Sequence, residues 1–218
     1  MCLRFACLTL LATFSLPATP LVTVGGTSVL NEGLVTNVVD ALTVNFDLGT
    51  APTTGPIRYS YLPNNIQTGS TSGTLTPTGD TSAYLSVSPI LGNPVTITFN
   101  EDVNYFGFYA SSLDAYNSIS FYEGNSLLMA MTGTALITAA GGTARDAYVN
   151  VFSSAPADNF NKVVLASSQA AFETDNHSFR AADGRFDGQV PEPSTFGLSG
   201  GGVALCFFAR FRRRTSLA

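Results

Sequence analysis

The sequence predicts an all-β fold, a two-sheet antiparallel sandwich of jelly-roll type. Short alternating or β-branched apolar runs recur along the middle of the chain, separated by turn residues. Gly (20) and Pro (11) are frequent, and charged residues are only 11% of the 218 residues, against about 25% in ordinary soluble proteins. No middle segment shows sustained helical amphipathicity, so no helix is predicted there.

The predicted strands lie within residues 21–182, the expected sandwich domain. They are Val35–Phe46, Ile57–Leu62, Ser82–Val87, Val95–Phe99, Val103–Tyr109, Ile119–Tyr122, Leu127–Met131, Ala147–Phe152, Val163–Ala166 and Ala171–Arg180. Tyr122–Ser126 is predicted to be a hairpin connection, and Asn100–Asp102 a second turn. The polar stretch Pro63–Asp80 is expected to be the most mobile loop. A closed barrel is the alternative that the same pattern allows.

Residues 1–20 have the pattern of an export signal peptide. Arg4 precedes the apolar run Phe5–Leu16, Pro17 ends this run, and the small residue Ala18 lies near a plausible cleavage point. The run is shorter than the roughly 20 residues that span a bilayer. The alternative is a first strand or helix buried in the domain.

The C-terminal end carries a different pattern. After a linker at residues 183–190, residues 191–218 begin with Pro191, Glu192 and Pro193, followed by the uncharged run Phe196–Ala209. A basic cluster closes the run, and it contains Arg210, Arg212, Arg213 and Arg214. Arginines stay on the cytoplasmic side of a membrane, so this hydrophobic helix would leave the preceding domain outside. A helix of this length covers about 21 Å of a hydrocarbon core of about 30 Å, which suits temporary retention.

This order of Pro-Glu-Pro, apolar run and arginine cluster resembles the PEP-CTERM sorting tail of bacterial exosortase substrates. The resemblance implies that an exosortase, a membrane-embedded processing enzyme, recognises Pro191–Pro193 and releases the tail, so the chain contacts the membrane only transiently. It also implies a Gram-negative-type bacterium, with a membrane-anchored precursor that moves to the cell surface or extracellular matrix. Extracellular polysaccharide, as in a biofilm, is the implied partner. The alternative is an ordinary C-terminal anchor.

A second resemblance covers Val95–Arg180. The segments that carry it are Phe106–Asn117, Ile119–Gly124, Ala147–Phe152, Phe160–Leu165 and Phe172–His177. Their order is similar to a family of exosortase-dependent surface proteins. The chain departs from that pattern at Ala110, Thr174 and His177. The resemblance implies no established enzymatic role.

Charge and cysteine content exclude several classes of function. The formal net charge is −5, and four of the ten basic residues lie in the cluster Arg210–Arg214, which argues against a basic face for nucleic acid. The three cysteines, Cys2, Cys7 and Cys206, lie in the two terminal segments. A mature chain without these segments has no disulfide and no thiol chemistry.

Calcium is the most credible ion for an exported acidic domain, because it prefers oxygen ligands. Asp175 and Asn176, in the last predicted strand, are the candidate ligands, by analogy with the structural calcium of many sandwich-type carbohydrate-binding modules. The alternative is that both side chains satisfy turn amides. Asp183–Gly188 lacks the acidic ladder of an EF-hand and is predicted to belong to the linker.

A polar–aromatic loop is the candidate ligand-contact surface. Asp114, Tyr116 and Asn117 combine an aromatic ring, on which a sugar can pack, with polar side chains that can bond hydroxyl groups. The absence of Trp weakens a lectin hypothesis, since most other aromatic side chains are expected to pack in the core.

The acids offer only weak support for catalysis. A glycoside hydrolase needs two carboxyl groups about 5 to 10 Å apart. Asp114, Glu123, Glu173 and Asp175 are candidates, and the last two share a strand face, but their spacing does not require convergence. His177 is the only histidine, and we expect it at the surface or at a strand end, without a nucleophile elbow before it.

The preferred function is therefore a non-enzymatic, exported surface or matrix protein that is sorted by an exosortase. One alternative is a carbohydrate-binding module with a structural calcium. A glycan-active enzyme is the third hypothesis.

Overall fold

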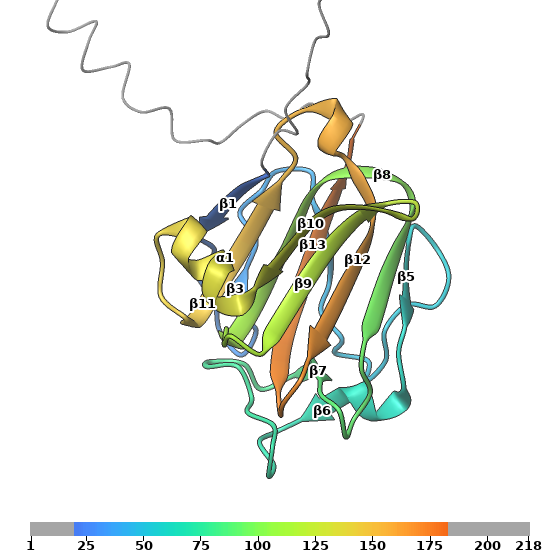
Figure 1. Cartoon of the computed structure of the whole chain (residues 1–218). Helices are drawn as coiled ribbons and strands as arrows, with labels where there is room; N and C mark the ends of the chain where they lie inside the picture. The colour runs from blue at the N-terminus through green and yellow to red at the C-terminus, as the bar shows by residue number, and fades with distance from the viewer. Residues whose placement is uncertain (1–19, 183–218) are drawn as a thin grey trace, which may run out of the picture. The chain divides into compact units, whose positions relative to one another are not determined.

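The computed structural model describes residues 20–182 as an antiparallel all-β domain (Figure 1). Eleven strands form one hydrogen-bonded sheet and two more form a small separate sheet. This confirms the predicted all-β, antiparallel class. The predicted signal peptide, the linker from residue 183 and the sorting tail lie outside the described residues.

The elements follow one another in chain order. The strands are β1 (Leu21–Val24), β2 (Thr27–Val29), β3 (Gly33–Val35), β4 (Leu42–Val44), β5 (Ile57–Ser60), β6 (Ile66–Thr68), β7 (Ala83–Val87), β8 (Val95–Ser112), β9 (Asn117–Glu123), β10 (Ser126–Thr132), β11 (Arg145–Phe152), β12 (Phe160–Ser167) and β13 (Phe172–Ala181). The helices are η1 (Pro63–Asn65), α1 (Gly133–Ala140) and η2 (Pro156–Asp158).

Strand β8 belongs to both halves of the large sheet. Its first part pairs with β5 and β12, and its second part pairs with β11 and β13. The predicted turn at Asn100–Asp102 is therefore wrong, because these residues continue the strand. They are polar and exposed where β8 passes from one set of partners to the other, so their composition reflects solvent contact and not chain reversal.

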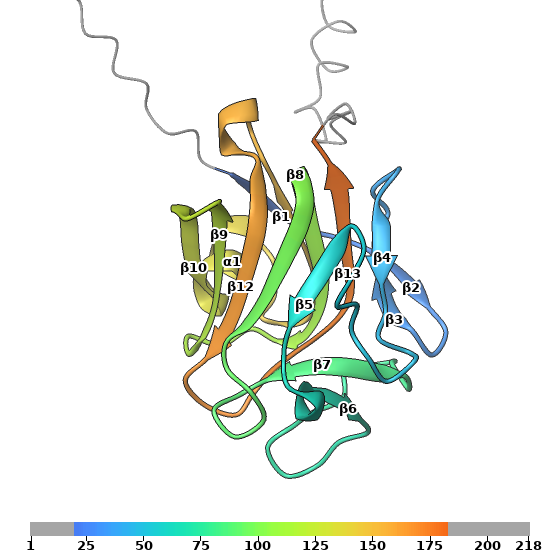
Figure 2. The same ribbon diagram turned by 90° about the vertical axis from the view of Figure 1, so that its right-hand side faces the viewer.

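Figure 2 shows β9, β10 and β12 on one side of β8, and β13 and β4 on the other. Aromatic side chains of these strands form one shared core. Phe106, in the second part of β8, lies 6.3 Å from Phe121 of β9 between ring centroids. Phe99, in the first part, lies 5.3 Å from Phe179 of β13. Facing layers joined by such contacts give a sandwich-like fold.

Helix α1 corrects the prediction that the middle of the chain holds no helix. Thr132 caps it by accepting a 3.2 Å hydrogen bond from the backbone N–H of Ala135, and Gly141 ends it with φ 65°. Leu136 and Ile137 are its buried anchors. Eight residues are too few to produce a recognisable helical period, and only the two caps signal the helix.

Turns also modify two other predictions. The long strand expected at Val35–Phe46 is reduced to β4, because Asp40 and Phe46 have φ values of 62° and 56°. Pro63–Asp80 begins with η1 and β6 and is not a loop throughout.

The hairpin at Tyr122–Ser126 is confirmed, since β9 and β10 are antiparallel with Glu123 opposite Ser126.

Candidate functional site

The candidate site lies along β13, where a bulge divides the side chains between two faces. The pairing of β13 with β8 shifts register between Asp175 and Ser178. Asn176 occupies the bulge with φ 50°, and its Nδ2 donates to the carbonyls of Glu32 (2.6 Å) and Leu34 (3.1 Å). The bulge therefore joins β13 to the segment around β3.

His177 points into the aromatic core. Its Nδ1 lies 3.0 Å from the Tyr59 hydroxyl and its Nε2 lies 2.9 Å from Thr174 Oγ1. Phe46 and Phe106 contact its ring edge-on, with centroids 5.1 and 5.5 Å away. The expected position at the surface or at a strand end is thus wrong: the side chain is fully buried. The neighbouring sequence could not reveal this, because Tyr59, Phe46 and Phe106 are far from His177 in the chain.

Burial also sets the protonation state of His177. Removal from water lowers the pKa of the imidazole to about 3, so the ring is neutral at physiological pH. Inside the core, each ring nitrogen of His177 forms a hydrogen bond with a hydroxyl group, one from Tyr59 and one from Thr174. This arrangement gives the histidine a packing role.

Asp175 projects from the other face of β13 and meets Asp80, which precedes β7. Asp175 Oδ1 accepts the N–H of Asn176 at 2.7 Å, and Asp80 Oδ1 accepts the N–H and hydroxyl of Ser82 at 2.7 and 2.6 Å. The pKa of Asp175 is raised to about 10, mainly by burial and secondly by a hydrogen bond with Asp80. The sequence analysis missed Asp80, whose only local signal is the Asp-x-Ser spacing of a turn.

Glu173 lies two residues before Asp175 and is also buried. Its Oε1 accepts the N–H of Leu75 at 2.9 Å, and its Oε2 accepts the Ser111 hydroxyl at 3.4 Å. Burial raises the pKa of Glu173, and the charge of Asp114 adds to this effect. Both oxygens of Glu173 thus have partners inside the fold.

The predicted contact loop separates into exposed and buried parts. The Tyr116 hydroxyl donates to Asp114 Oδ2 at 2.8 Å, and both side chains are partly exposed. Asn117 is fully buried, and it accepts the N–H of Asp114 at 2.7 Å and donates to Ser167 Oγ and the Ala171 carbonyl. Asn117 therefore shapes the loop from within and leaves Asp114 and Tyr116 facing solvent.

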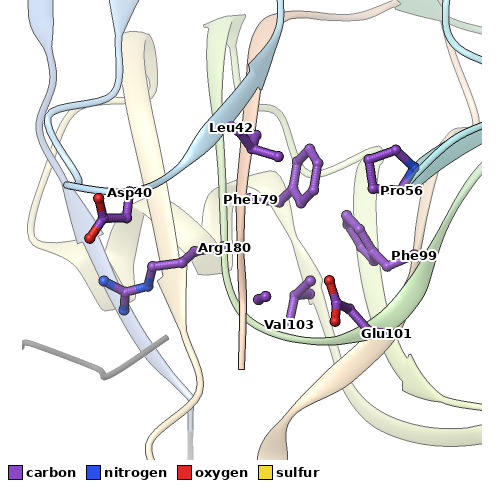
Figure 3. Close-up of a pocket in the computed structure, with 9 residues that line it drawn as sticks. Asp40, Leu42, Pro56, Phe99, Glu101, Val103, Phe179 and Arg180 are labelled. Atoms are coloured by element: carbon purple, nitrogen blue, oxygen red, sulfur yellow. The ribbon is translucent and has the colours of Figure 1, made fainter. Parts of the chain in front are cut away.

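An apolar cavity of about 250 Å³ lies between β4, β8 and β13. Its lining residues are Asp40, Leu42, Pro56, Phe99, Glu101, Val103, Phe179, Arg180 and Ala181. Asp40 and Arg180 lie on one side of it and Glu101 on the other (Figure 3). It is smaller than the roughly 300–1,000 Å³ of drug-sized ligand sites. No sequence motif predicted it, because its walls come from three separate strands.

The part of the chain that the structure describes shows neither a metal-binding cluster nor a membrane-spanning helix. Residues 20–182 contain no group of three or more His, Cys, Asp or Glu side chains placed to hold a metal. No helix in the same range has the length and hydrophobicity needed to cross a bilayer. The predicted tail helix lies beyond this range.

The described residues form an all-β domain, and the sorting motif in the sequence that follows indicates an exported protein with a membrane-anchoring tail. Residues 189–214 match the model of the PEP-CTERM protein-sorting motif. The match includes Pro191, Glu192, Pro193 and the cluster Arg210–Arg214, and it indicates a substrate of exosortase-type sorting. No curated protein and no solved structure matches the chain.

Proposed function

We propose that this chain is a non-enzymatic surface or matrix protein of a Gram-negative-type bacterium, with a domain that associates with extracellular polysaccharide. The observation that carries the proposal is the sorting motif at residues 189–214. In this proposal a signal peptide at residues 1–20 directs export, and an exosortase removes the tail. The described domain then remains at the cell surface or in the matrix, with a jelly-roll order of strands.

The domain has properties that suit this location. Its stability comes from the shared aromatic core and the hydrogen bonds of the β13 region, and it needs no disulfide. Its acidic composition favours solubility and limits association with anionic polymers unless a divalent cation bridges them.

The second candidate function is a carbohydrate-binding module, and the Asp114–Tyr116 pair favours it. The 2.8 Å hydrogen bond holds the partly exposed tyrosine next to a carboxylate. A sugar can pack on such a ring while the carboxylate accepts its hydroxyl groups.

A glycan-active enzyme remains the third hypothesis and is less well supported. It would use Asp114 with Glu173, whose carboxyls interact through charge. Glu173 is only 3% exposed and its two oxygens already accept hydrogen bonds. These contacts favour a structural role for Glu173.

The sorting function is tested in the native host by replacing Glu192 with Ala. We expect unprocessed precursor to collect in the membrane fraction, and its intact mass should include the arginine cluster. Deleting Arg210–Arg214 should have the same effect. Glu123→Ala, at the exposed end of β9, is the matched control and should be released normally.

The intact mass of the wild-type protein completes this test. A released protein that lacks both the N-terminal segment and the residues near and after Pro191 supports the proposal. Normal release of Glu192→Ala, or a wild-type mass that retains the arginine cluster, contradicts exosortase processing.

A further inference from the structure

Strand β10 lies at the outer end of its part of the sheet. Figure 2 shows it beyond β9, β12 and β8. Among residues 20–182, β9 is the only strand that pairs with it. The opposite edge of β10 therefore presents backbone N–H and C=O groups that no described strand satisfies, and such an edge is a template for the addition of another strand.

The composition of β10 does little to protect this edge. The strand reads Ser-Leu-Leu-Met-Ala-Met-Thr and contains no charged residue and no proline. Native proteins ordinarily protect free edges with charges, proline, bulges or covering segments. A register shift between Leu127 and Met129 disrupts only the first part of the strand, so Met129–Thr132 remains a regular edge opposite β9.

The side chains of β10 form an apolar surface that is only partly covered. Leu127 is 56% exposed. Leu128, Met129 and Met131 pack against the core but remain partly exposed. The chain has only three methionines, and two of them lie in this strand. Because methionine is adaptable and frequent on surfaces that bind other proteins, β10 combines a free backbone edge with side chains suited to a protein partner.

Charge indicates which partner fits this edge. In the described domain, acidic side chains outnumber the basic ones, which are Arg58, Arg145, Lys162 and Arg180. Two copies of the domain therefore repel each other in most orientations. An approach along β10 avoids this repulsion in the paired strands, because β10 is uncharged. Two identical antiparallel strands are also related by a two-fold axis, the commonest symmetry of soluble oligomers.

We propose that β10 pairs in the antiparallel direction with β10 of a second copy of this chain, with the two-fold axis near Ala130. The two free backbone edges then satisfy each other, and the sheet continues from one domain into the next. The side chain of Ala130 is small and exposed, so it permits close approach at the axis. The partly exposed methionines of both copies become covered.

The pairing also brings two contact loops into one assembly. Thr132, at the end of β10, lies opposite Ser118, which directly follows the loop at Asp114–Asn117. Because the paired strands run in opposite directions, the two loops lie at opposite ends of them. Two loops bind one polymer more tightly than one loop does. This consequence rests on the carbohydrate-binding function proposed above, whereas the pairing itself does not.

Sedimentation equilibrium of the full chain in mild detergent measures the association, with the buffer density matched to the detergent. A small interface of this kind should have a Kd of about 1–100 μM, so the wild-type chain should be mainly dimeric at about 500 μM and monomeric at about 0.1 μM.

Ala130→Lys tests the position of the interface. It places a positive charge from each copy near the axis, so Kd should rise by about tenfold or more. Its Tm should match that of the wild type, because residue 130 is exposed. Ser60→Lys is the matched control, since it makes the same charge change at the exposed end of another edge strand, β5, and should dimerise as the wild type does.

Ala130→Cys gives a second measurement that does not depend on weakened binding. Two copies paired near this residue should form a disulfide under air oxidation, because the paired positions are close enough for one. Peptide mass spectrometry locates the link and separates it from links made by Cys2, Cys7 or Cys206. Ser60→Cys, on β5, should not form the corresponding link.

The outcomes separate this interface from other modes of association. A concentration-dependent dimer that Ala130→Lys weakens, together with the disulfide in Ala130→Cys, would support the pairing. A wild-type chain that stays monomeric up to the highest concentration would overturn it. Equal association of wild type and Ala130→Lys would also overturn it, because another part of the chain would then hold the copies together.

Discussion

Gly33 lies directly against the ring of Tyr109, so closely that a Cβ atom at residue 33 would overlap the ring. Gly33 also has φ 69°, a conformation that other residues adopt only with strain. The Tyr109 hydroxyl donates to the Thr78 carbonyl at 2.7 Å, which fixes the ring in place. Strand β3 can therefore approach β8 only because residue 33 has no side chain.

Gly33→Ala should destabilise the domain by about 2–4 kcal/mol, since it adds steric overlap to about 1–2 kcal/mol of backbone strain. Gly49→Ala is the matched control, because Gly49 has φ 71° but no heavy atom within 4 Å of an added Cβ. Urea unfolding of both variants isolates the contribution of the ring. Equal losses in the two variants would show that β3 can move away without cost.

The raised pKa of Tyr105 predicts that the domain loses stability at high pH. Burial raises the pKa of Tyr105 to about 12, while the unfolded chain loses this proton near the ordinary value of 10. The folded state thus retains the proton longer, and its stability falls as pH rises from 10 towards 12. The difference of about two pKa units corresponds to roughly 2–3 kcal/mol.

Tyr105→Phe tests this alkaline effect. The variant should be less stable at pH 7 by about 1–2 kcal/mol, because it loses hydrogen bonds to Thr36 and Asn150. Its disadvantage relative to wild type should shrink between pH 10 and pH 12. A disadvantage that stays constant across this range would contradict the assigned shift.

The contact loop predicts a specific effect on polysaccharide binding. Tyr116→Ala should weaken binding to matrix polysaccharide by about tenfold, equivalent to about 1.4 kcal/mol, because the exposed ring is lost. Tyr122→Ala, which removes a partly exposed ring from β9, is the matched control. Binding is measured by co-sedimentation with calcium present. An equal effect of both changes, or no binding by the wild type, would count against this loop.

Asn117 should affect stability more than binding. Its side chain makes three hydrogen bonds in a fully buried position, at 2.7, 3.2 and 3.2 Å. Asn117→Ala leaves the partners of these bonds without donors or acceptors and should cost about 2–4 kcal/mol. Thermal unfolding measures the loss, and a change below about 0.5 kcal/mol would reject this role.

The sequence predicted those features that depend on neighbouring residues. The hairpin at Tyr122–Ser126 has a Gly–Asn turn between apolar strands, and Gly124 adopts φ 57° as such a turn requires. The sorting motif is likewise contiguous, so it is recognisable without a structure. Local patterns of this kind need no information about the rest of the fold.

Features that depend on distant partners were missed. His177 is polar and follows Asp175 and Asn176, which suggests a surface position, but Tyr59 of β5 and Phe46, which lies just after β4, enclose it. The Asp80–Asp175 pair joins residues that are far apart in the chain. Strand β8 appeared as two strands because polar residues mark both turns and exposed parts of continuous strands.

The order of pairing has a consequence for the time at which the chain can fold. In the pairing of β1 with β11, Leu21 lies opposite Phe152 and Val24 lies opposite Val149. The partner of the first strand is therefore synthesised much later than the strand itself. Domains built from such distant pairings fold slowly, because long loops must close before contacts form. In a nascent chain of this kind, β1 remains without its partner until residues 149–152 have been synthesised. The topology thus provides an interval in which a polypeptide can be threaded through a membrane channel before its architecture closes.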